Sequence, residues 1–402
     1  MRADVQAMFE QDLLPRNRAW RAWIDSNQGD PDWFAPLKAK ARAQGLWNMG
    51  FTELPAGAEG TPLSNLDFAA VAEVMGRLPW APGIFNCDAP NLPNMIMLAD
   101  AANAEQQEQW LRPLLEGRMR SGFAMTEPDT ASSDAKNIAF EITRTDTGYV
   151  LNGKKWFSTG AAHPDCGFVV LLGKMAGSGP RQGHTSLIVP MDTPGLIVAR
   201  RVRYLGWEDP VAPTAELHFD NVEVPHSALL GAEGQGFAQA QTRLGPARVH
   251  HCMRLIGLAE LALELMVARA AERQTFGQSL ASYDTIQGWI AQSRIDIELA
   301  RMITLKCAWL LDKHGHAGAW RDVSIAKVAV PRAVYGVTER ALQVFGAMGG
   351  TDDTPLHAIH AWARGIRIGD GPDEVHLRQI FKQEAAPSGP LSDNPYIFPF
   401  QP

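Results

Sequence analysis

The feature that most constrains the fold is a change of residue pattern along the chain, from helical to strand-like and back to helical. From Val5 onward, apolar residues recur with the period of amphipathic helices. Around Ser121 the pattern changes to short β-branched and alternating runs, such as 168–172 and 186–189, which Gly, Pro, Asn and Asp separate. Past Gly236 the helical period returns. This order predicts an α+β protein and not a doubly wound sheet.

The same changes of pattern predict three domains, since 402 residues are too many for one ordinary core. They are an N-terminal all-helical domain over residues 1–120, a middle antiparallel β domain resembling a barrel over 121–232, and a C-terminal four-helix bundle over 233–402. Long helices are expected within 293–311 and 322–345, and short connections make them antiparallel neighbours. After about Glu384 the sequence is Pro-rich and predicts an extended tail.

Composition and charge exclude several classes of protein. Hydrophobic residues make up 46% of the chain and no run of 18 apolar residues occurs, so we expect no integral membrane association. The net charge of −7 opposes nucleic-acid binding, which needs clustered cationic charge. The chain reaches Glu10 and Asp12 without an apolar segment, so we expect a cytoplasmic protein.

Two sequence signals are missing. Cys87, Cys166, Cys252 and Cys307 have no C-x-x-C spacing, so we expect reduced thiols, with neither a metal site nor a disulfide framework. No G-x-G-x-x-G follows a strand, which disfavours a nicotinamide-binding domain.

Two segments of the β unit carry candidate chemistry. The loop 123–134 concentrates hydroxyl groups, small residues and backbone amides, which suits a polar or phosphorylated ligand. Taken alone, the loop is more simply explained as an ordinary Asx or Ser turn. In 152–160, an expected hairpin turn at Asn152-Gly153 precedes Trp156 and two hydroxyl residues. An aromatic side chain beside hydroxyl groups can stack on a planar ring and hydrogen-bond to it. The alternative is that Trp156 faces the core of the β unit.

Together these segments resemble the acyl-CoA dehydrogenase superfamily, whose middle domain begins with a Thr-Glu-Pro loop and continues through an Asn-Gly-x-Lys-x-Trp motif. Residues 219–236 are similar to the family's domain junction, 272–277 to its dimer-interface motif and 343–349 to its Gln-x-x-Gly-Gly-x-Gly stretch. The resemblance covers nearly the whole chain in order. The strings at 371–376, 127–133 and 85–87 resemble the branch of the human tenth and eleventh acyl-CoA dehydrogenases, which suggests an unusual acyl chain such as a hydroxylated one.

The resemblance implies FAD as the cofactor. The residues that it places around FAD are Phe123, Met125, Thr126, Ser132, Ser133, Trp156, Phe157, Ser158, Arg273, Phe276, Gln343, Gly346, Pro372 and Glu374. Those that it places at the substrate are Ser133, Arg248 and Gly371. Arg273, Gln343 and Gly346 would reach the FAD of a neighbouring subunit, so a homotetramer is expected, with a homodimer as the alternative. Without the family, Arg273 is a helix-end cation and Gln343 a polar residue on a helix face.

The resemblance also implies that Asp370 is the base that removes the α-proton of an acyl-CoA substrate. Many members carry Glu there, and Ala347 replaces a motif glycine. The base position used by other members, before Arg248, is Ala247, which leaves no rival carboxylate. The alternative is that Asp370 caps the helix that starts near Pro372. Burial in an apolar tunnel is expected to raise the pKa of the base.

These implications favour an FAD-dependent acyl-CoA dehydrogenase of fatty acid metabolism that passes electrons to electron-transfer flavoprotein or a similar acceptor. By resemblance, a flavin hydroxyl and the backbone N–H of Asp370 polarise the thioester carbonyl, and hydride leaves to flavin N5. Two alternatives stay open. One is a nitroalkane-oxidase-like or oxygen-reactive flavoenzyme on the same fold, and the other is a catalytically silent interaction subunit.

Overall fold

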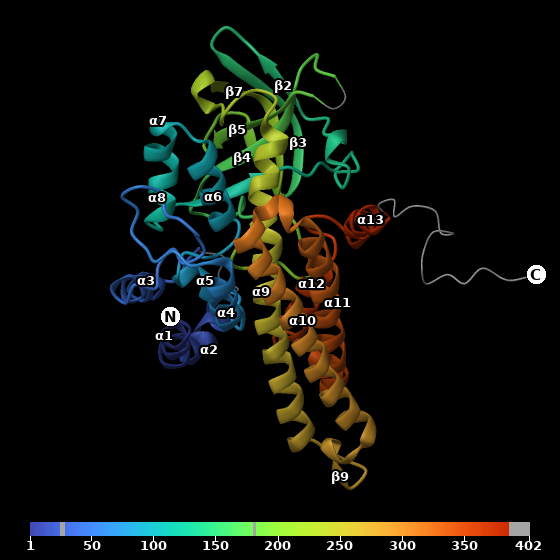
Figure 1. Cartoon of the computed structure of the whole chain (residues 1–402). Helices are drawn as coiled ribbons and strands as arrows, with labels where there is room; N and C mark the ends of the chain where they lie inside the picture. The colour runs from blue at the N-terminus through green and yellow to red at the C-terminus, as the bar shows by residue number, and fades with distance from the viewer. Residues whose placement is uncertain (25–28, 180–181, 386–402) are drawn as a thin grey trace, which may run out of the picture.

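The predicted order of helices, sheet and helices is confirmed. A computed structural model describes residues 1–24, 29–179 and 182–385, and the expected C-terminal tail lies outside the described residues. The β-sheet sits at one end of a long helical bundle, and the N-terminal helices pack along its side (Figure 1). One core of buried apolar residues runs through all three parts.

The N-terminal part is built from short helices. They are α1 (Arg2–Met8), α2 (Asn17–Trp23), α3 (Phe34–Ala43), α4 (Asn65–Gly76), α5 (Ala81–Ile84), α6 (Asn91–Ala101), α7 (Ala104–Gln106) and α8 (Arg112–Leu115). Ser64 caps α4 by accepting a hydrogen bond from the Asp67 N–H, and Asn103 and Gln106 form a capping box at α7. Trp20 and Trp80 are buried with ring centroids 6.0 Å apart, and their contact anchors the core of this part.

The middle part is a seven-stranded sheet. Its strands are β1 (Arg120–Ala124), β2 (Glu141–Arg144), β3 (Gly148–Ser158), β4 (Cys166–Met175), β5 (His184–Pro190), β6 (Leu196–Arg201) and β7 (Ala215–Pro225). Strand β4 is the exception to the predicted antiparallel arrangement, because it runs parallel to β1 and β2. Residue alternation indicates which face of a strand is buried, but it does not encode strand direction.

The prediction of a hairpin turn at Asn152-Gly153 was wrong. Strand β3 continues through these residues, and its register with β7 shifts between Leu151 and Gly153. Asn152 accepts a hydrogen bond from the Asn221 N–H of β7 at 2.8 Å, and a Cβ on Gly153 would meet the Phe140 ring at 2.9 Å. The Asn-Gly pair therefore forms a β-bulge, where glycine fits a positive φ and a close approach.

The C-terminal part is dominated by three long helices, α9 (Gly236–Glu272), α10 (Asp284–Gly318) and α11 (Trp320–Phe345), followed by α12 (Leu356–Ile366) and α13 (Asp373–Glu384). Two short strands, β8 (Gln274–Thr275) and β9 (Gln278–Ser279), close the tip between α9 and α10. Helices α4 and α9 cross closely, since a Cβ on Gly76 would meet the Arg254 carbonyl oxygen at 2.3 Å. This contact fixes the N-terminal helices against the bundle.

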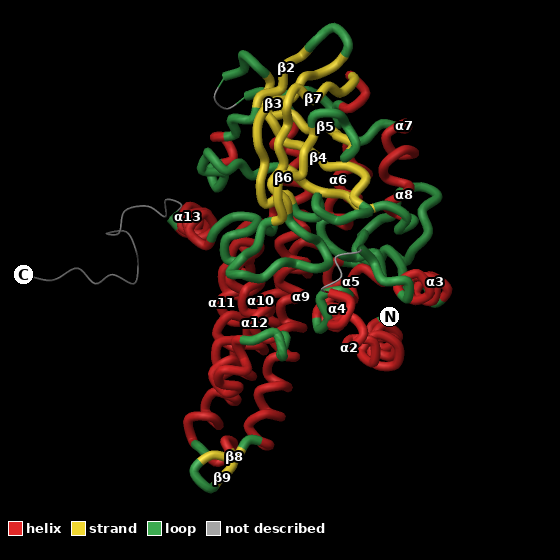
Figure 2. The backbone as a smooth tube through the Cα atoms, turned by 180° about the vertical axis from the view of Figure 1, so that it is seen from behind, coloured by secondary structure: helices red, strands yellow, loops and turns green. Residues whose placement is uncertain are grey.

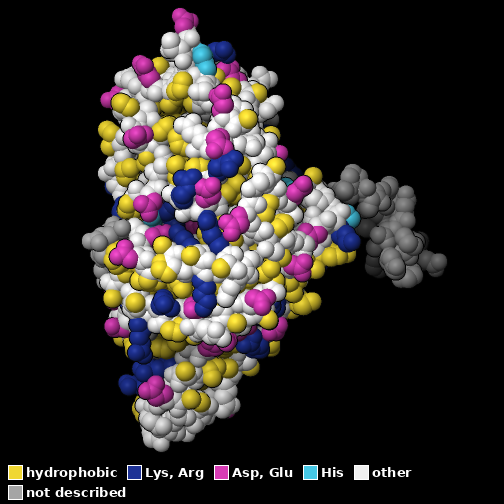
Figure 3. Space-filling model, turned by 90° about the vertical axis from the view of Figure 1, so that its left-hand side faces the viewer, with side chains coloured by type: hydrophobic (Ala, Val, Ile, Leu, Met, Phe, Trp, Pro, Cys, Tyr) yellow, Lys and Arg dark blue, Asp and Glu magenta, His cyan; other side chains and the backbone are white. Residues whose placement is uncertain are grey.

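The tip lies at the opposite end of the bundle from the sheet in both Figure 1 and Figure 2. Acidic and basic side chains are interspersed over the face that Figure 3 presents. No described helix combines the length and the apolar character needed to cross a bilayer. The junction where the sheet meets α9 and the turn between α12 and α13 is the part of the fold that holds the candidate site.

Candidate active site

Asp370 lies in the turn between α12 and α13 and adopts a φ of +56°. It does not cap α13: the N-cap residue is Pro372, and no side chain caps the helix. The capping interpretation of Asp370 was therefore wrong. Its side chain is 22% exposed, and Oδ2 is buried with no hydrogen-bond partner among the described residues. A carboxylate oxygen without a partner is free to accept a proton.

Cationic groups from α9 and α11 surround this carboxylate. Burial raises the pKa of Asp370, but the nearby imidazole of His251 and the positive charges of Arg243, Arg248 and Lys327 together outweigh burial and lower it. The expected rise of the pKa was therefore wrong, and Asp370 is ionised at neutral pH. Burial also lowers the pKa of Arg243 to about 10, which leaves that guanidinium charged.

His251 Nε2 lies 3.4 Å from Asp370 Oδ2. Burial, followed by the charge of Arg254, lowers the pKa of His251 to about 3, so the ring is neutral at pH 7. Arg254 Nη2 lies 3.1 Å from His251 Nδ1 and can only donate. Nδ1 is thus the acceptor, and Nε2 carries the proton toward Asp370. His251 in this tautomer can support the carboxylate but cannot replace it as a base.

On the sheet side, the structure brings together the predicted residues of β1, β3 and the loop between them. The Trp156 N–H donates to the Thr126 carbonyl at 2.9 Å, and Phe123 pairs with Thr159. Trp156 Nε1 and Ser158 Oγ are buried without hydrogen-bond partners among the described residues. Unsatisfied buried groups of this kind are costly, so they fit a polar ring such as the isoalloxazine of FAD.

Glu127 holds the loop in place. Its carboxylate accepts hydrogen bonds from the Ala139 and Phe140 N–H groups at 2.8 and 3.0 Å and from Lys155 Nζ at 2.8 Å. Lys155 Nζ also donates to the Met125 carbonyl at 2.8 Å. Burial lowers the pKa of Lys155 to about 8, against the attraction of Glu127. This pair ties the predicted FAD loop to β3.

Arg243 connects the sheet side to Asp370. Its guanidinium carbon lies 3.8 Å from the centroid of the Phe123 ring, and its Nε donates to Asn94 Oδ1 at 2.7 Å. This is a close cation–π contact in a buried setting. Phe123 and Asp370, which lie far apart in the sequence, therefore border the same region.

The remaining predicted residues form a second group, far from the first. Arg273 and Phe276 lie at the tip, where Phe276 is 97% exposed, and Gln343 and Gly346 lie at the exposed end of α11. Phe345 contacts Arg269, one turn before Arg273, so this group is itself connected. Within one chain, these residues do not reach Asp370 or Trp156.

Other predicted residues lie near one group or the other with varied exposure. Met125 and Ser132 are partly buried, and the Ser132 hydroxyl accepts from the Glu127 N–H at 3.0 Å. Ser133 and Phe157 are exposed. Gly371 and Pro372 follow Asp370 directly, and Glu374 is exposed on α13. Arg248 is buried and donates from Nε to the Asp370 carbonyl at 2.9 Å.

The sequence interpretation missed Arg243, His251 and Lys327. The signal that could have found them is a charged or imidazole side chain in the buried part of an otherwise apolar helix, since such residues are rarely buried without a role. The four cysteines are free and buried. No group of three or more His, Cys, Asp or Glu side chains suited to a metal ion occurs in the described part of the chain.

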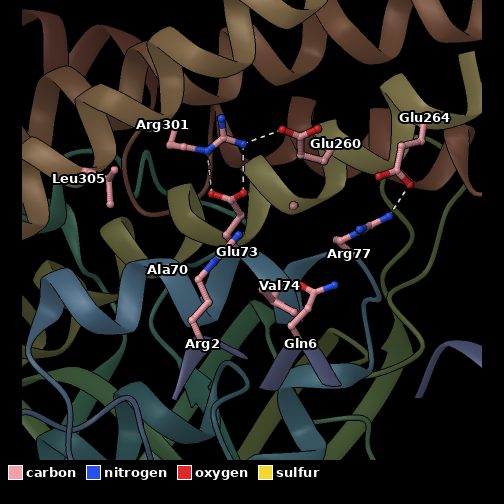
Figure 4. Close-up of a pocket in the computed structure, with 11 residues that line it drawn as sticks. Arg2, Gln6, Ala70, Glu73, Val74, Arg77, Glu260, Glu264, Arg301 and Leu305 are labelled. Atoms are coloured by element: carbon pink, nitrogen blue, oxygen red, sulfur yellow. Dashed lines mark hydrogen bonds and ion pairs between the residues drawn. The ribbon is translucent and has the colours of Figure 1, made fainter. Parts of the chain in front are cut away.

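A cavity of about 570 Å³ lies elsewhere, between α1, α4, α9 and α10 (Figure 4). Arg301 bonds both oxygens of Glu73 at 3.0 Å and contacts Glu260 at 2.6 Å, and Arg77 pairs with Glu264. Because these lining charges are already paired, the cavity lacks the free acid or base that chemistry needs. Asp370, whose Oδ2 has no hydrogen-bond partner among the described residues, is the stronger candidate.

Three family models match the chain in order. They are described as the acyl-CoA dehydrogenase N-terminal domain over residues 1–118, the middle domain over 122–222 and the C-terminal domain over 234–384. "Probable acyl-CoA dehydrogenase FadE2" of Mycobacterium tuberculosis is 46% identical over 350 residues, which cover 87% of this chain and 84% of that protein.

A second relative is longer. "Acyl-CoA dehydrogenase family member 11" of Gallus gallus is 46% identical over 351 residues, and the match covers 87% of this chain but 44% of the relative. The chain thus spans less than half the length of that protein. Among solved structures, a Mycobacterium abscessus protein assigned to the acyl-CoA dehydrogenases is 42% identical, with a TM-score of 0.90 over 95% of this chain and 96% of that one.

Proposed function

This chain belongs to the acyl-CoA dehydrogenase family of FAD-dependent oxidoreductases that act on CH–CH bonds, and we propose that it converts an acyl-CoA thioester to the 2-enoyl-CoA. The observation that carries the proposal is Asp370: an ionised, partly buried carboxylate whose buried Oδ2 has no hydrogen-bond partner among the described residues, beside residues suited to a flavin. In this proposal Asp370 removes the α-proton.

The cations around Asp370 support this role. A thioester α-proton is weakly acidic, so the negative charge that develops on the carbonyl oxygen must be stabilised where it forms. Arg243, Arg248 and Lys327 supply more positive charge than one carboxylate cancels. The surplus keeps Asp370 ionised before the reaction and favours an anion in the same region during it.

The sheet residues would hold the cofactor. Trp156 Nε1 and Ser158 Oγ would donate to the polar edge of the ring, and Phe123, Met125 and Thr126 would border it, with Ser132 and Phe157 nearby. When bound, FAD supplies the acceptor for the hydride that leaves the β-carbon. Ser133, Arg248 and Gly371 remain the proposed substrate contacts.

The second group of residues supports a homo-oligomer. Arg273, Phe276, Gln343 and Gly346 would bind the FAD of a neighbouring subunit, as Pro372 and Glu374 would from α13. Helix α10 also exposes Ile295, Leu299, Met302 and Trp309, with exposed fractions of 51, 60, 63 and 46%. Their spacing places them on one helix face, and exposed apolar patches mark interfaces. We propose a homotetramer, with a homodimer as the alternative.

The reduced cofactor must pass its electrons on, and we propose electron-transfer flavoprotein or a similar acceptor as the partner. The proposed place of the enzyme is fatty acid metabolism in the cytoplasm.

The test is anaerobic titration of the purified holoenzyme with acyl-CoA esters of different chain length, branching and hydroxylation. We expect bound flavin to bleach with at least one ester and the 2-enoyl-CoA to form in equal amount. Bleaching by nitroalkanes but by no ester would point to the carbon-acid oxidase alternative. Protein that binds no flavin even after FAD addition would point to the silent interaction subunit.

A further inference from the structure

The turn that carries Asp370 is held through its backbone carbonyl groups rather than through its carboxylate. Arg248 Nε donates to the Asp370 carbonyl at 2.9 Å, and His376 Nε2 lies 3.4 Å from the same oxygen. Lys327 Nζ donates to the Gly371 carbonyl at 3.2 Å and to the Ile366 carbonyl. The three donors come from α9, α13 and α11, so three helices converge on one turn.

The backbone of this turn needs such support. Asp370 has a φ of +56°, a region that non-glycine residues rarely adopt, and Gly371 follows with a φ of +109°. A Cβ on Gly371 would meet His376 Nε2 at 2.9 Å, so α13 packs tightly against the turn. Unusual backbone conformations persist when the surroundings fix them, and they concentrate at functional sites.

Lys327 is the most unusual of the three donors. Its side chain is 1% exposed, yet none of the described ion pairs involves it. Ile366 is the last residue of α12, so the ammonium lies at a helix C-terminus, where carbonyl groups are unsatisfied and the helix dipole is negative. Burial lowers the pKa of Lys327, and Asp370 is the first charge that opposes this effect.

We propose that Lys327 is a positioning residue: by binding the carbonyl oxygens of Ile366 and Gly371, it clamps the turn from both sides and aims the Asp370 carboxylate. This inference rests on the proposed function, in which Asp370 is the base. Because Lys327 binds backbone and not the carboxylate, it fixes the base while leaving Oδ2 free. A lysine placed on the carboxylate itself would compete with the substrate proton.

The clamp has two separable effects, geometric and electrostatic. Hydrogen bonds to the two carbonyls set where the carboxylate points, and a misplacement of about 1 Å can cost on the order of 100-fold in rate. The positive charge favours the ionised form of Asp370. Other groups facing Asp370 are Arg243, Arg248 and His251 from α9, with Arg254 behind them, and His376 from α13. Asp373 of α13 is a further negative charge that acts on Lys327. These stay unchanged when Lys327 is replaced.

Three variants of the holoenzyme separate the two effects: Lys327→Met removes the donors and the charge, Lys327→Gln removes the charge but keeps an N–H donor, and Lys327→Arg keeps both. Flavin reduction by the best ester is measured against pH, with FAD content and thermal unfolding. We expect the Lys327→Met enzyme to retain FAD, and its flavin to be reduced by the ester about 10- to 100-fold more slowly. The acid limb of its pH–rate profile should move to higher pH. Lys327→Gln should show the same pH shift with a smaller rate loss, and Lys327→Arg should restore both.

Thr338→Val is the matched control on α11, since Thr338 is buried and its hydroxyl bonds only carbonyls of its own helix. It should change stability without moving the pH profile. A parental rate and pH profile in Lys327→Met would overturn the clamp. If Lys327→Met does not fold, an unshifted profile in Lys327→Gln would overturn it. Failure of the proposed function is distinguishable from failure of the clamp. If Asp370 is not the base, the flavin of the Asp370→Asn enzyme would be reduced by the ester at the parental rate.

Discussion

Replacing Asp370 by Asn tests the proposed base most directly. The two side chains have nearly the same shape, and Arg248 and His376 contact the backbone carbonyl of residue 370 rather than its carboxylate. The turn should therefore persist, and FAD should stay bound. The substitution removes the negative charge of the side chain and, with it, the ability to accept a proton.

The expected magnitude follows from the absence of a substitute base. The His251 nitrogen nearest to Asp370 already carries a proton, since Nδ1 accepts from Arg254. The nearest carboxylate along the turn, Asp373, is bound by Arg332 at 2.9 Å and by Arg367 at 2.9 Å. Loss of a general base commonly costs about 100- to 10,000-fold, and we expect the upper part of this range, about 4 to 5 kcal/mol in activation free energy.

The assay is stopped-flow bleaching of bound flavin by the ester that reduces the parent enzyme fastest. Asp373→Asn is the matched control, because it makes the same chemical change three residues later in a buried carboxylate. It should lower stability, by leaving two arginines without their partner, and spare the rate per bound flavin. An Asp370→Asn enzyme that reduces flavin within a few fold of the parent would refute the assignment of the base.

The same variant carries a stability test. The pKa of Asp370 is lower in the folded chain than its ordinary value, so this group contributes stability that is present above the ordinary pKa and lost as pH falls through the folded pKa. Asn cannot contribute this stability. Asp370→Asn should therefore unfold more easily than the parent at pH 7, and the difference should shrink in acid.

The other predictions concern FAD retention and pH. Lys155→Met should break the buried pair with Glu127, lower the free energy of unfolding by about 3 to 5 kcal/mol and weaken FAD binding. Lys154→Met, at the exposed neighbouring residue, should change neither stability nor FAD binding. Thermal unfolding and FAD titration measure the two effects. Arg273→Ala should lower FAD content of the purified oligomer relative to Gln274→Ala, and equal content would contradict the cross-subunit contact. Burial lowers the pKa of His376 from 6.5 to about 4, so the stability that neutral His376 contributes is present above pH 6.5 and is lost as pH falls toward 4. His376→Gln should therefore reduce the loss of unfolding free energy between pH 6.5 and pH 4 by about 3 kcal/mol. An unchanged loss of unfolding free energy over this pH range would contradict the prediction.

The order of the three parts could be predicted from the sequence because hydrophobic periodicity reports burial directly. The long helices around 293–311 and 322–345 extend further in the structure, to Asp284–Gly318 and Trp320–Phe345, since amphipathic spacing loses its signal near helix ends. Strand direction at β4 and the bulge at Asn152-Gly153 could not be predicted, because both depend on what packs opposite a residue.

The candidate site shows the same limit. Asp370 could be found from its motif, but the groups that set its pKa lie on α9 and α11 and share no local pattern with it. Arg243 precedes Asp370 by more than 100 residues and meets it only because α9 passes the turn between α12 and α13. Electrostatic environment is a property of the folded arrangement, so a motif can indicate a candidate base without indicating its pKa.

The division of the predicted FAD residues into two groups is itself an argument for the oligomer. Phe123, Trp156 and Ser158 lie at the sheet end of the bundle, whereas Arg273 and Gln343 lie at its far end. Arg243 of α9 contacts Phe123, and the 30 residues from Arg243 to Arg273 correspond to about 45 Å at 1.5 Å per residue. One cofactor cannot span both ends of one chain, so if both groups bind FAD, a second chain must bring its tip to the first chain's sheet. Phe276, exposed at 97% beside Arg273, is the kind of aromatic side chain that such a contact would bury.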